Sequence, residues 1–344
     1  MKKTKIAANI FFAIGLFVLG LMIYKIGLDV IWKNILLVRW WFLAIIGIWA
    51  VVYLINAVSF KTIIRDGSPE SKSVSFLKIY KLTVSGYAIN SITPFGLLGG
   101  EPYRIIRLRS FVGIQKATSS VLLYMMMHIV SHFIFWMVSI PILFLIVPNV
   151  STTVRIILIV AAVASLLLLY WSFTVYTNGF IIKALRFASR LPFVGKKIRA
   201  YHQKHFNKIE QMDLLIADLY KNRKKDFVKS LLVELFSRFV QCIEIVFLMF
   251  AIGFPITFAQ SVIIESIQSL IGNLFFFMPM QLGAREGGFL LVFSILSLAA
   301  AHGVYVSLGM RIRELVWSVL GLALIKTDRE PQNVFVESEP EVHT

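Results

Sequence analysis

The chain has 344 residues, of which 58% are hydrophobic, and a formal net charge of +17. Its mean hydropathy of +0.79 excludes a water-soluble globular domain, because too little polar surface would remain to face water. Several apolar runs reach about 18 residues or more, the length that spans a bilayer core as a helix. The sequence therefore predicts an all-α polytopic membrane protein. The single cysteine, Cys242, excludes an internal disulfide and a cysteine-based metal site.

The apolar segments begin near the N-terminus. Residues 6–26 follow three lysines, and this run is too long for a signal peptide and lacks a small-residue cleavage site, so we expect a retained first helix. Residues 82–116 are apolar at first, break at residues 94–100 and resume with several arginines. This pattern predicts a hairpin that enters and leaves on one side of the membrane. Five further full spans are expected at residues 40–64, 117–147, 153–176, 228–252 and 304–325.

Basic residues concentrate in residues 178–229, which hold 13 Lys and Arg against four Asp and Glu, a surplus of nine. No aromatic-interleaved fold or groove-reading helix accompanies them, so we expect no nucleic-acid partner. A cytoplasmic segment that attracts anionic lipid head groups explains this charge. Apolar residues at helical spacing predict an amphipathic interfacial helix within the segment: Ile209, Met212, Leu215, Ile216 and Leu219.

One transmembrane domain is expected over residues 1–326, with the basic segment inside it, followed by a disordered cytoplasmic tail over residues 327–344. Lysine and arginine beside the first and last spans place both termini in the cytoplasm. The chain shows no eukaryotic targeting signal, which favours a prokaryotic cytoplasmic (inner) membrane as its location.

Two stretches in opposite halves of the chain share a pattern of proline, glycine and glutamate. The first reads Pro94-Phe-Gly-Leu-Leu-Gly-Gly-Glu101-Pro-Tyr-Arg104, and the second reads Pro279-Met-Gln-Leu-Gly-Ala-Arg-Glu286. The two prolines are 185 positions apart, and so are the two glutamates. Because Pro and Gly break helices, each motif predicts a broken helix in apolar surroundings. Counting crossings places the hairpins on opposite sides, which predicts an inverted repeat of about six full spans and two re-entrant hairpins. Two full crossings at either hairpin are the alternative.

Glu101 and Glu286 are the central site candidates. Glu101 precedes a proline, which favours the first helical position, so we expect Glu101 to cap a half-helix from residue 102 to about residue 110. Capping alone is one interpretation of each glutamate. In the other, a half-helix N-terminus near the membrane midplane binds a lipid phosphate together with Arg104 and Arg285. The glutamates then either pair with these arginines in the empty site or titrate and couple transport to protons.

Other polar residues are candidates for the same cavity. Arg107 either joins the lipid site or snorkels to the interface. His128 and His132 share a helix face at a spacing that can bind metal, but no third ligand is evident, so we expect no metal site. Two pairs at helical spacing more often stabilise helix contacts than bind a ligand: Glu234 with Arg238, and Arg311 with Glu314. The remaining candidates are Asn90, Thr93, Glu265 and Asn273.

The two motifs in this order resemble the lysylphosphatidylglycerol synthase transmembrane, or flippase-like, family over roughly residues 5–325. The best-known members fuse this region to a cytoplasmic aminoacyl transferase that modifies phosphatidylglycerol, and the membrane region moves the product between leaflets. The resemblance implies lipid translocation. Its matching positions are Gly99, Gly100, Glu101, Arg104, Gly283, Arg285 and Glu286. Two features depart from the pattern: only residues 327–344 follow the last span, so we expect no transferase domain, and the second motif begins Pro-Met-Gln where Pro-Gly-Gly is commoner.

These features favour a transporter that moves an anionic or aminoacylated phospholipid, or another phosphate-bearing lipid, between leaflets, without a cofactor or a catalytic residue. The alternative is a membrane component of lysylphosphatidylglycerol synthesis or of a lipid-linked transferase system. Against an enzyme, residues 178–229 are too short to provide the water-facing surface that aminoacyl-tRNA recognition needs. A third hypothesis makes the chain a partner subunit of a separate lipid-modifying enzyme.

Overall fold

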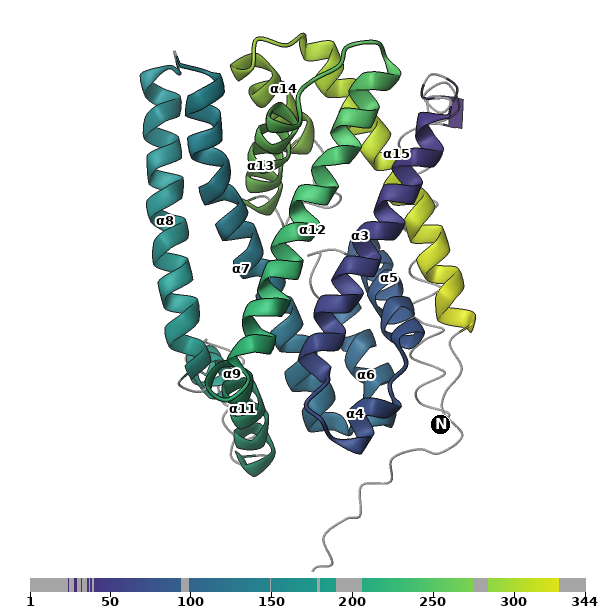
Figure 1. Cartoon of the computed structure of the whole chain (residues 1–344), viewed down its shortest axis with the longest axis vertical. Coiled ribbons are helices and arrows are strands. Elements are labelled where there is room, and N and C mark those ends of the chain that lie inside the picture. The colour runs from purple at the N-terminus through teal and green to yellow at the C-terminus, as the bar shows by residue number, and fades with distance from the viewer. Residues whose placement is uncertain are drawn as a thin grey trace, which may run out of the picture.

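The computed structural model describes residues 40–93, 99–148, 150–177, 180–189, 206–274 and 284–327, with six single positions between 24 and 38. Within these residues every regular element is a helix (Figure 1). The helices are α3 (Trp41–Ile64), α4 (Pro69–Ser73), α5 (Phe76–Ile92), α6 (Gly100–Val112), α7 (Ile114–Ile146), α8 (Thr152–Thr177), α9 (Phe180–Ala188), α11 (Phe206–Lys221), α12 (Lys224–Ala251), α13 (Phe258–Leu274), α14 (Ala284–Ile295) and α15 (Ala300–Thr327).

Two sets of four helices repeat the same order. The helices α3, α5, α6 and α7 correspond to α12, α13, α14 and α15, and each begins 183, 182, 184 and 186 positions before its counterpart, in that order. Figure 1 shows α3 descending and α12 rising, with the α5–α6 hairpin in the lower half and the α13–α14 hairpin in the upper half. The predicted inverted repeat, with hairpins that enter from opposite ends, is therefore confirmed.

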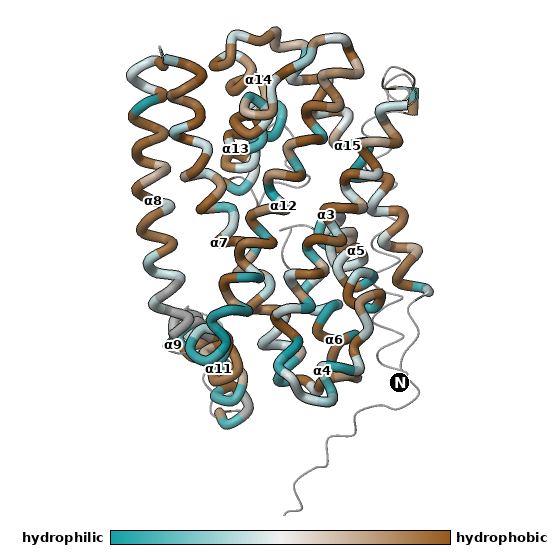
Figure 2. The backbone as a smooth tube through the Cα atoms, in the orientation of Figure 1, coloured by the Kyte–Doolittle hydropathy of each residue, from teal (hydrophilic) through white to brown (hydrophobic). Residues whose placement is uncertain are grey.

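The all-α membrane architecture is evident in the long helices. Three of the described helices are long and apolar enough to cross a bilayer: α3, α7 and α8 over Thr152–Ser172. Both α12 and α15 have 28 residues, which is sufficient length, but each carries charged residues in its middle. Those charges are buried inside the protein, and hydrophobic residues occur along most of the length of each helix (Figure 2). The span expected at residues 6–26 lies outside the described residues except for position 24.

The basic segment contains two short helices at the lower end of the molecule, α9 and α11. Asp213 of α11 accepts hydrogen bonds from the backbone N–H groups of Ile181 (2.7 Å) and Ile182 (3.0 Å), which lie in the first turn of α9. On α11, Leu214 is exposed, whereas the opposite face is buried. That buried face carries Ile209, Ile216 and Leu219. The prediction of an amphipathic helix in this segment is confirmed by α11.

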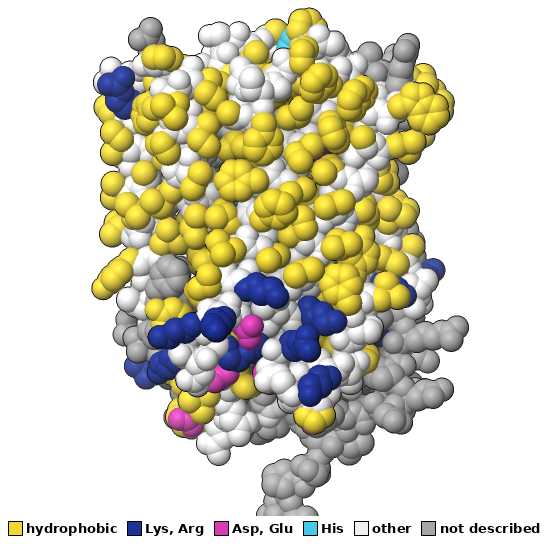
Figure 3. Space-filling model, viewed as in Figure 1, with side chains coloured by type: hydrophobic (Ala, Val, Ile, Leu, Met, Phe, Trp, Pro, Cys, Tyr) yellow, Lys and Arg dark blue, Asp and Glu magenta, His cyan; other side chains and the backbone are white. Residues whose placement is uncertain are grey.

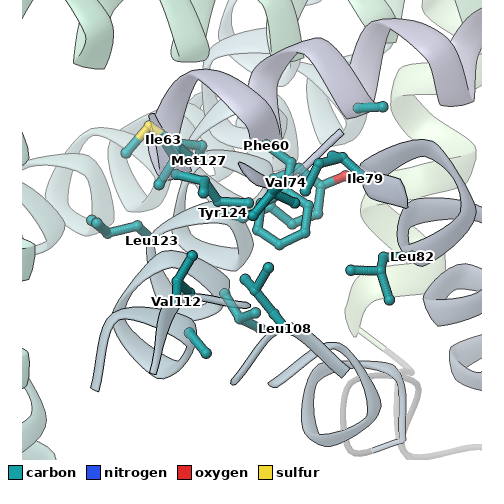
Figure 4. Close-up of a cluster of buried hydrophobic side chains, with 14 of the residues drawn as sticks. Phe60, Ile63, Val74, Ile79, Leu82, Leu108, Val112, Leu123, Tyr124 and Met127 are labelled. Atoms are coloured by element: carbon teal, nitrogen blue, oxygen red, sulfur yellow. The ribbon is translucent and has the colours of Figure 1, made fainter. Parts of the chain in front are cut away.

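Each half of the molecule has its own apolar core. In the lower half, Phe60 of α3 stacks on Tyr124 of α7 with ring centroids 4.6 Å apart, and Leu108 of α6 belongs to the same cluster (Figure 4). In the upper half, Phe289 of α14 and Met310 of α15 belong to a second cluster. Burial of apolar surface therefore holds each short helix of a hairpin against the long helices of its own half.

The close approach of α5 to α15 depends on Gly321, where a Cβ would meet the Cβ of Ala88 and lie 2.9 Å from the carbonyl oxygen of Val84. We expect Gly321→Val to separate these helices and to lower the free energy of unfolding by about 1–3 kcal/mol, the usual cost of overpacking. Thermal unfolding of the purified protein in detergent measures this loss. The control is Gly47→Ala in α3, where nothing lies within 4 Å of the added Cβ, and its midpoint should stay unchanged or rise slightly. An unchanged midpoint for Gly321→Val would contradict the close packing.

Candidate functional site

The first broken helix brings an amide and a carboxylate together at the start of α6. The Gly100 N–H donates to Asn90 Oδ1 of α5 (2.7 Å), and Asn90 Nδ2 donates to Glu101 Oε1 (3.0 Å). The helix begins at Gly100 and ends at Val112, so Glu101 lies inside its first turn. The prediction that Glu101 caps a helix starting at residue 102 is therefore wrong, because the capping oxygen comes from Asn90 on the preceding helix.

Arg104 is buried one turn after the start of α6. Its Nη1 donates to Glu101 Oε1 (3.0 Å), and its Nε and Nη2 donate to the carbonyl oxygens of Leu82 (3.4 Å) and Thr83 (3.3 Å). Its guanidinium lies 5.3 Å from the ring centroid of Tyr124. The second oxygen of Glu101, Oε2, is buried and has no hydrogen-bond partner among the described residues. Glu101 therefore keeps acceptor capacity beside a positive charge.

Two glycines make this packing possible. A Cβ at Gly86 of α5 would collide with the guanidinium of Arg104, and a Cβ at Gly100 would collide with the carbonyl oxygen of Gly86. The start of α6 thus lies directly against the backbone of α5, and any larger side chain at either position would displace the Glu101–Arg104 pair.

Three other predicted residues flank the first site. A Cβ at Gly99 would lie 2.6 Å from the side chain of Ile89. Thr93 Oγ1 donates to the Ile89 carbonyl oxygen (3.0 Å), which also accepts the backbone N–H of Thr93 (3.1 Å) at the end of α5. Arg107 is buried, and its Nη2 donates to the carbonyl oxygen of Ile325 in α15 (3.4 Å). The guanidinium of Arg107 therefore points into the protein, so the snorkelling interpretation is wrong.

The second broken helix carries two ion pairs to α15. Glu286 Oε1 accepts hydrogen bonds from Arg311 Nε (3.0 Å) and Nη2 (2.6 Å). Arg285 binds Glu314 through two parallel hydrogen bonds of 2.9 and 2.6 Å. The charges of Arg311 and Glu314, which the sequence places one turn apart, thus tie α15 to the first turn of α14. Glu286 is the more open of these carboxylates, with 32% of its side chain exposed.

A third ion pair to α15 comes from α12, and both of its side chains are buried. Arg313 donates from Nε and Nη2 to the two oxygens of Glu244 (2.9 and 3.0 Å), and Trp49 Nε1 donates to Glu244 Oε2 (2.7 Å). The guanidinium lies 3.7 Å from the ring centroid of Trp49, and Arg313 Nη1 lies 3.8 Å from Glu314. Sequence reasoning missed Arg313 and Trp49. The position of Arg313 within an apolar span could have indicated the pair, because a buried arginine needs a carboxylate partner nearby.

A separate polar network links α7 to α12. His128 Nδ1 lies 3.0 Å from Glu234 Oε2, and Arg238 donates to the carbonyl oxygen of His128 (3.3 Å) and to Ser131 Oγ (3.3 Å). The rings of His128 and His132 have centroids 5.5 Å apart. Among the described residues, no group of three or more His, Cys, Asp and Glu is placed to hold a metal ion. The histidines therefore belong to the polar contact between these two helices.

The last two candidates lie on α13. Asn273 Nδ2 donates to the carbonyl oxygen of Ser269 (2.7 Å) near the end of this helix. Glu265 Oε2 is buried without a hydrogen-bond partner in the described part of the chain, and Glu265 interacts electrostatically with Arg285 and Arg238. Glu265 is thus coupled electrostatically both to the start of α14 and to the α7–α12 network. Gly283 lies outside the described residues, as do residues 94–98 and 275–282.

The family model described as "Lysylphosphatidylglycerol synthase TM region" matches residues 7–321, which include both repeats except the last residues of α15. The chain belongs to this family. Membership confirms the resemblance carried by the motifs, and it supports a membrane location and suggests a role related to membrane lipids. Comparisons with curated proteins and with solved structures find no match.

The buried pair of Glu244 and Arg313 permits a double-mutant test. Glu244→Leu or Arg313→Met alone leaves one uncompensated buried charge, and we expect each to destabilise the protein by about 3–5 kcal/mol. The double variant should recover most of this loss, because neither charge then remains. Thermal unfolding in detergent measures all three variants. Losses that simply add in the double variant would show that the two side chains act independently.

Proposed function

We propose that this protein is a lipid transporter that moves an anionic or aminoacylated phospholipid, or another phosphate-bearing lipid, between leaflets. The observation that carries the proposal is the pair of broken helices that enter from opposite ends, each with arginine–carboxylate pairs at the start of its short helix. Such half-helix starts in inverted repeats form the substrate sites of many transporters. Membership of a family named for lysylphosphatidylglycerol synthesis supports a lipid as the substrate.

The ion pairs supply a way to bind a phosphate. In the structure Arg104 is neutralised by Glu101, and Arg311 is neutralised by Glu286. A lipid phosphate offers several oxygens with the geometry that guanidinium prefers, so it competes with the glutamate for the arginine. The positive end of the short helix favours the incoming anion. The arginine thereby has a negative partner both before and after binding.

The displaced glutamate suggests how transport is coupled to an ion. A carboxylate that has lost its arginine in apolar surroundings is costly to keep charged. Uptake of a proton removes this cost, so the proposal includes proton binding at Glu101 or Glu286 when lipid is bound. Two half-sites that face opposite ends then permit lipid to enter from one leaflet and leave to the other.

The proposed orientation follows from the basic residues. Lysine and arginine side chains form a band across the lower end of the face in Figure 3, and we place this end in the cytoplasm. Both termini are then cytoplasmic, residues 1–326 form one multi-pass domain, and residues 178–229 lie against anionic lipid head groups of a prokaryotic inner membrane.

A second candidate function follows from the family name. The chain could act as the membrane component of lysylphosphatidylglycerol synthesis or of a lipid-linked transferase system, beside a separate lipid-modifying enzyme. Transfer of lysine to phosphatidylglycerol by the purified chain alone would favour an enzyme. Co-purification of a lipid-modifying enzyme, without lipid transport by the chain, would favour a partner subunit.

Lipid transport in proteoliposomes tests the first proposal. Wild-type protein is expected to move fluorescent phosphatidylglycerol or its lysylated form faster than phosphatidylcholine. Glu101→Gln and Glu286→Gln should each lower the rate about tenfold or more, because an amide can neither take up the proton nor neutralise the arginine once the lipid has left. Glu210→Gln, at an exposed position of α11, is the matched control and should keep the wild-type rate.

Two outcomes would count against transport at these sites. Folded wild-type protein that moves none of the three lipids would remove the main support for a phospholipid transporter. Equal rates for all four proteins, with transport present, would place the substrate site away from the two broken helices.

A further inference from the structure

A groove of about 790 Å³ runs between α3 and α12. Leu54 and Val58 line it from α3, and Leu232 and Phe236 line it from α12. Both α12 side chains are more than half exposed, at 58% and 60%. The groove is basic near the start of α12, where its lining residues are Lys224, Lys225 and Lys229. An apolar trough therefore ends at three positive charges.

The walls of the groove are fixed to each other by hydrogen bonds. Ser59 Oγ of α3 lies 2.8 Å from Ser230 Oγ of α12. Arg223, just before α12, donates to the carbonyl oxygens of Thr62 (2.9 Å) and Ile63 (3.2 Å) at the end of α3. The groove is thus part of a rigid helix pair, and its occupant need not order the walls in order to bind.

The three lysines lack acidic partners in the described part of the chain. All three are exposed, and no described carboxylate forms an ion pair with any of them. Asp226, the acidic residue closest in sequence, is bound instead to Arg223 through hydrogen bonds of 2.7 and 2.9 Å. The groove therefore presents positive charge that a ligand must balance.

We propose that this groove binds one anionic phospholipid of the bilayer, with its phosphate at the lysines and an acyl chain along the apolar walls. From Lys224 to Phe236 α12 rises about 18 Å, since a helix rises 1.5 Å per residue. One leaflet contributes about 15 Å of a hydrocarbon core of about 30 Å. The groove therefore reaches from the head-group level to the depth of one leaflet, on the same side as the basic band in Figure 3.

The charge pattern distinguishes this occupant from others. A zwitterionic phospholipid fits the same trough, but it carries a cation that the lysines repel. A second copy of this chain would bring a further set of lysines to the same place if it bound face to face. An anionic phospholipid satisfies both the apolar walls and the charges, so it is the ligand that the groove fits best.

The groove is distinct from the proposed transport site. It lies along α3 and α12, which are equivalent helices of the two repeats, and none of its lining residues belongs to the Glu–Arg pairs described above. A lipid bound here touches both repeats at once. Its binding requires no transport, so the site stands or fails independently of the transporter proposal.

Native mass spectrometry of the whole protein, titrated in detergent with phosphatidylglycerol or phosphatidylcholine, tests the site. Wild type should retain phosphatidylglycerol preferentially. The triple variant Lys224→Gln, Lys225→Gln and Lys229→Gln should weaken this retention on the order of 10- to 100-fold, as expected for three lysines near an anionic head group. The matched control removes three exposed basic residues outside residues 178–229, at Lys72, Arg155 and Lys326, and should retain the lipid as wild type does.

A second variant tests the apolar wall. Leu232→Trp fills part of the trough without changing its charge, and it should lower phosphatidylglycerol retention while leaving the unfolding midpoint unchanged. The groove triple variant should lose retention whether or not the protein transports lipid, which separates this site from transport. Equal retention by the groove triple and the control triple would overturn the proposal. So would equal retention of both phospholipids, or a second protein chain bound in place of lipid.

Discussion

The structure depends on the cost of placing an ionised group in apolar surroundings. Several buried charges lie on helices long enough to span a bilayer, and each needs a partner of opposite sign. Arg313 satisfies this need through two hydrogen bonds to Glu244, and Arg285 does so through two hydrogen bonds to Glu314. Guanidinium and carboxylate match in shape, so a bidentate pair neutralises charge and sets the relative position of two helices. The α12–α15 and α14–α15 contacts are both defined in this way.

The two halves of the inverted repeat pair their buried charges in different ways. In the first half, Arg104 pairs with a glutamate on its own helix, and its other N–H groups donate to backbone carbonyl oxygens of α5. In the second half, Arg285 and Glu286 both pair with side chains of α15. The first pair is local and closely packed against glycine backbone, whereas the second set spans two helices and leaves Glu286 partly exposed. The two broken helices are equivalent in topology but not in the contacts that hold them.

The order of spans and broken helices could be predicted from the sequence because it depends on local features. Apolar length locates the spans, proline and glycine locate the breaks, and equal spacing of Glu101 and Glu286 from their prolines identifies the repeat. The ion pairs and hydrogen bonds between helices could not be predicted in the same way, because they depend on which helices become neighbours. Asn90 caps α6 from across the hairpin, and Trp49 reaches Glu244 over 195 positions. The sequence around Arg311 and Glu314 does not indicate that each of them pairs with a residue of α14 and not with the other.

The cost of placing charges in apolar surroundings also explains why α12 is central to the molecule. One side of this helix carries Glu234 and Glu244, which bind charged or polar partners on α7 and α15. Another side carries Leu232 and Phe236, which are exposed on the outer surface. A single helix thus separates the polar interior from the apolar surroundings, and it does so at its contact with α3, its counterpart in the other repeat. Any movement of one repeat against the other must therefore shear this boundary. Ser59 and Ser230 hold that boundary near one end, and the pair of Glu244 with Trp49 holds it towards the other. A change between two arrangements of the repeats would have to break the contacts at one of these ends, and at the first end it would break the Arg223 hydrogen bonds to Thr62 and Ile63 as well as the serine contact.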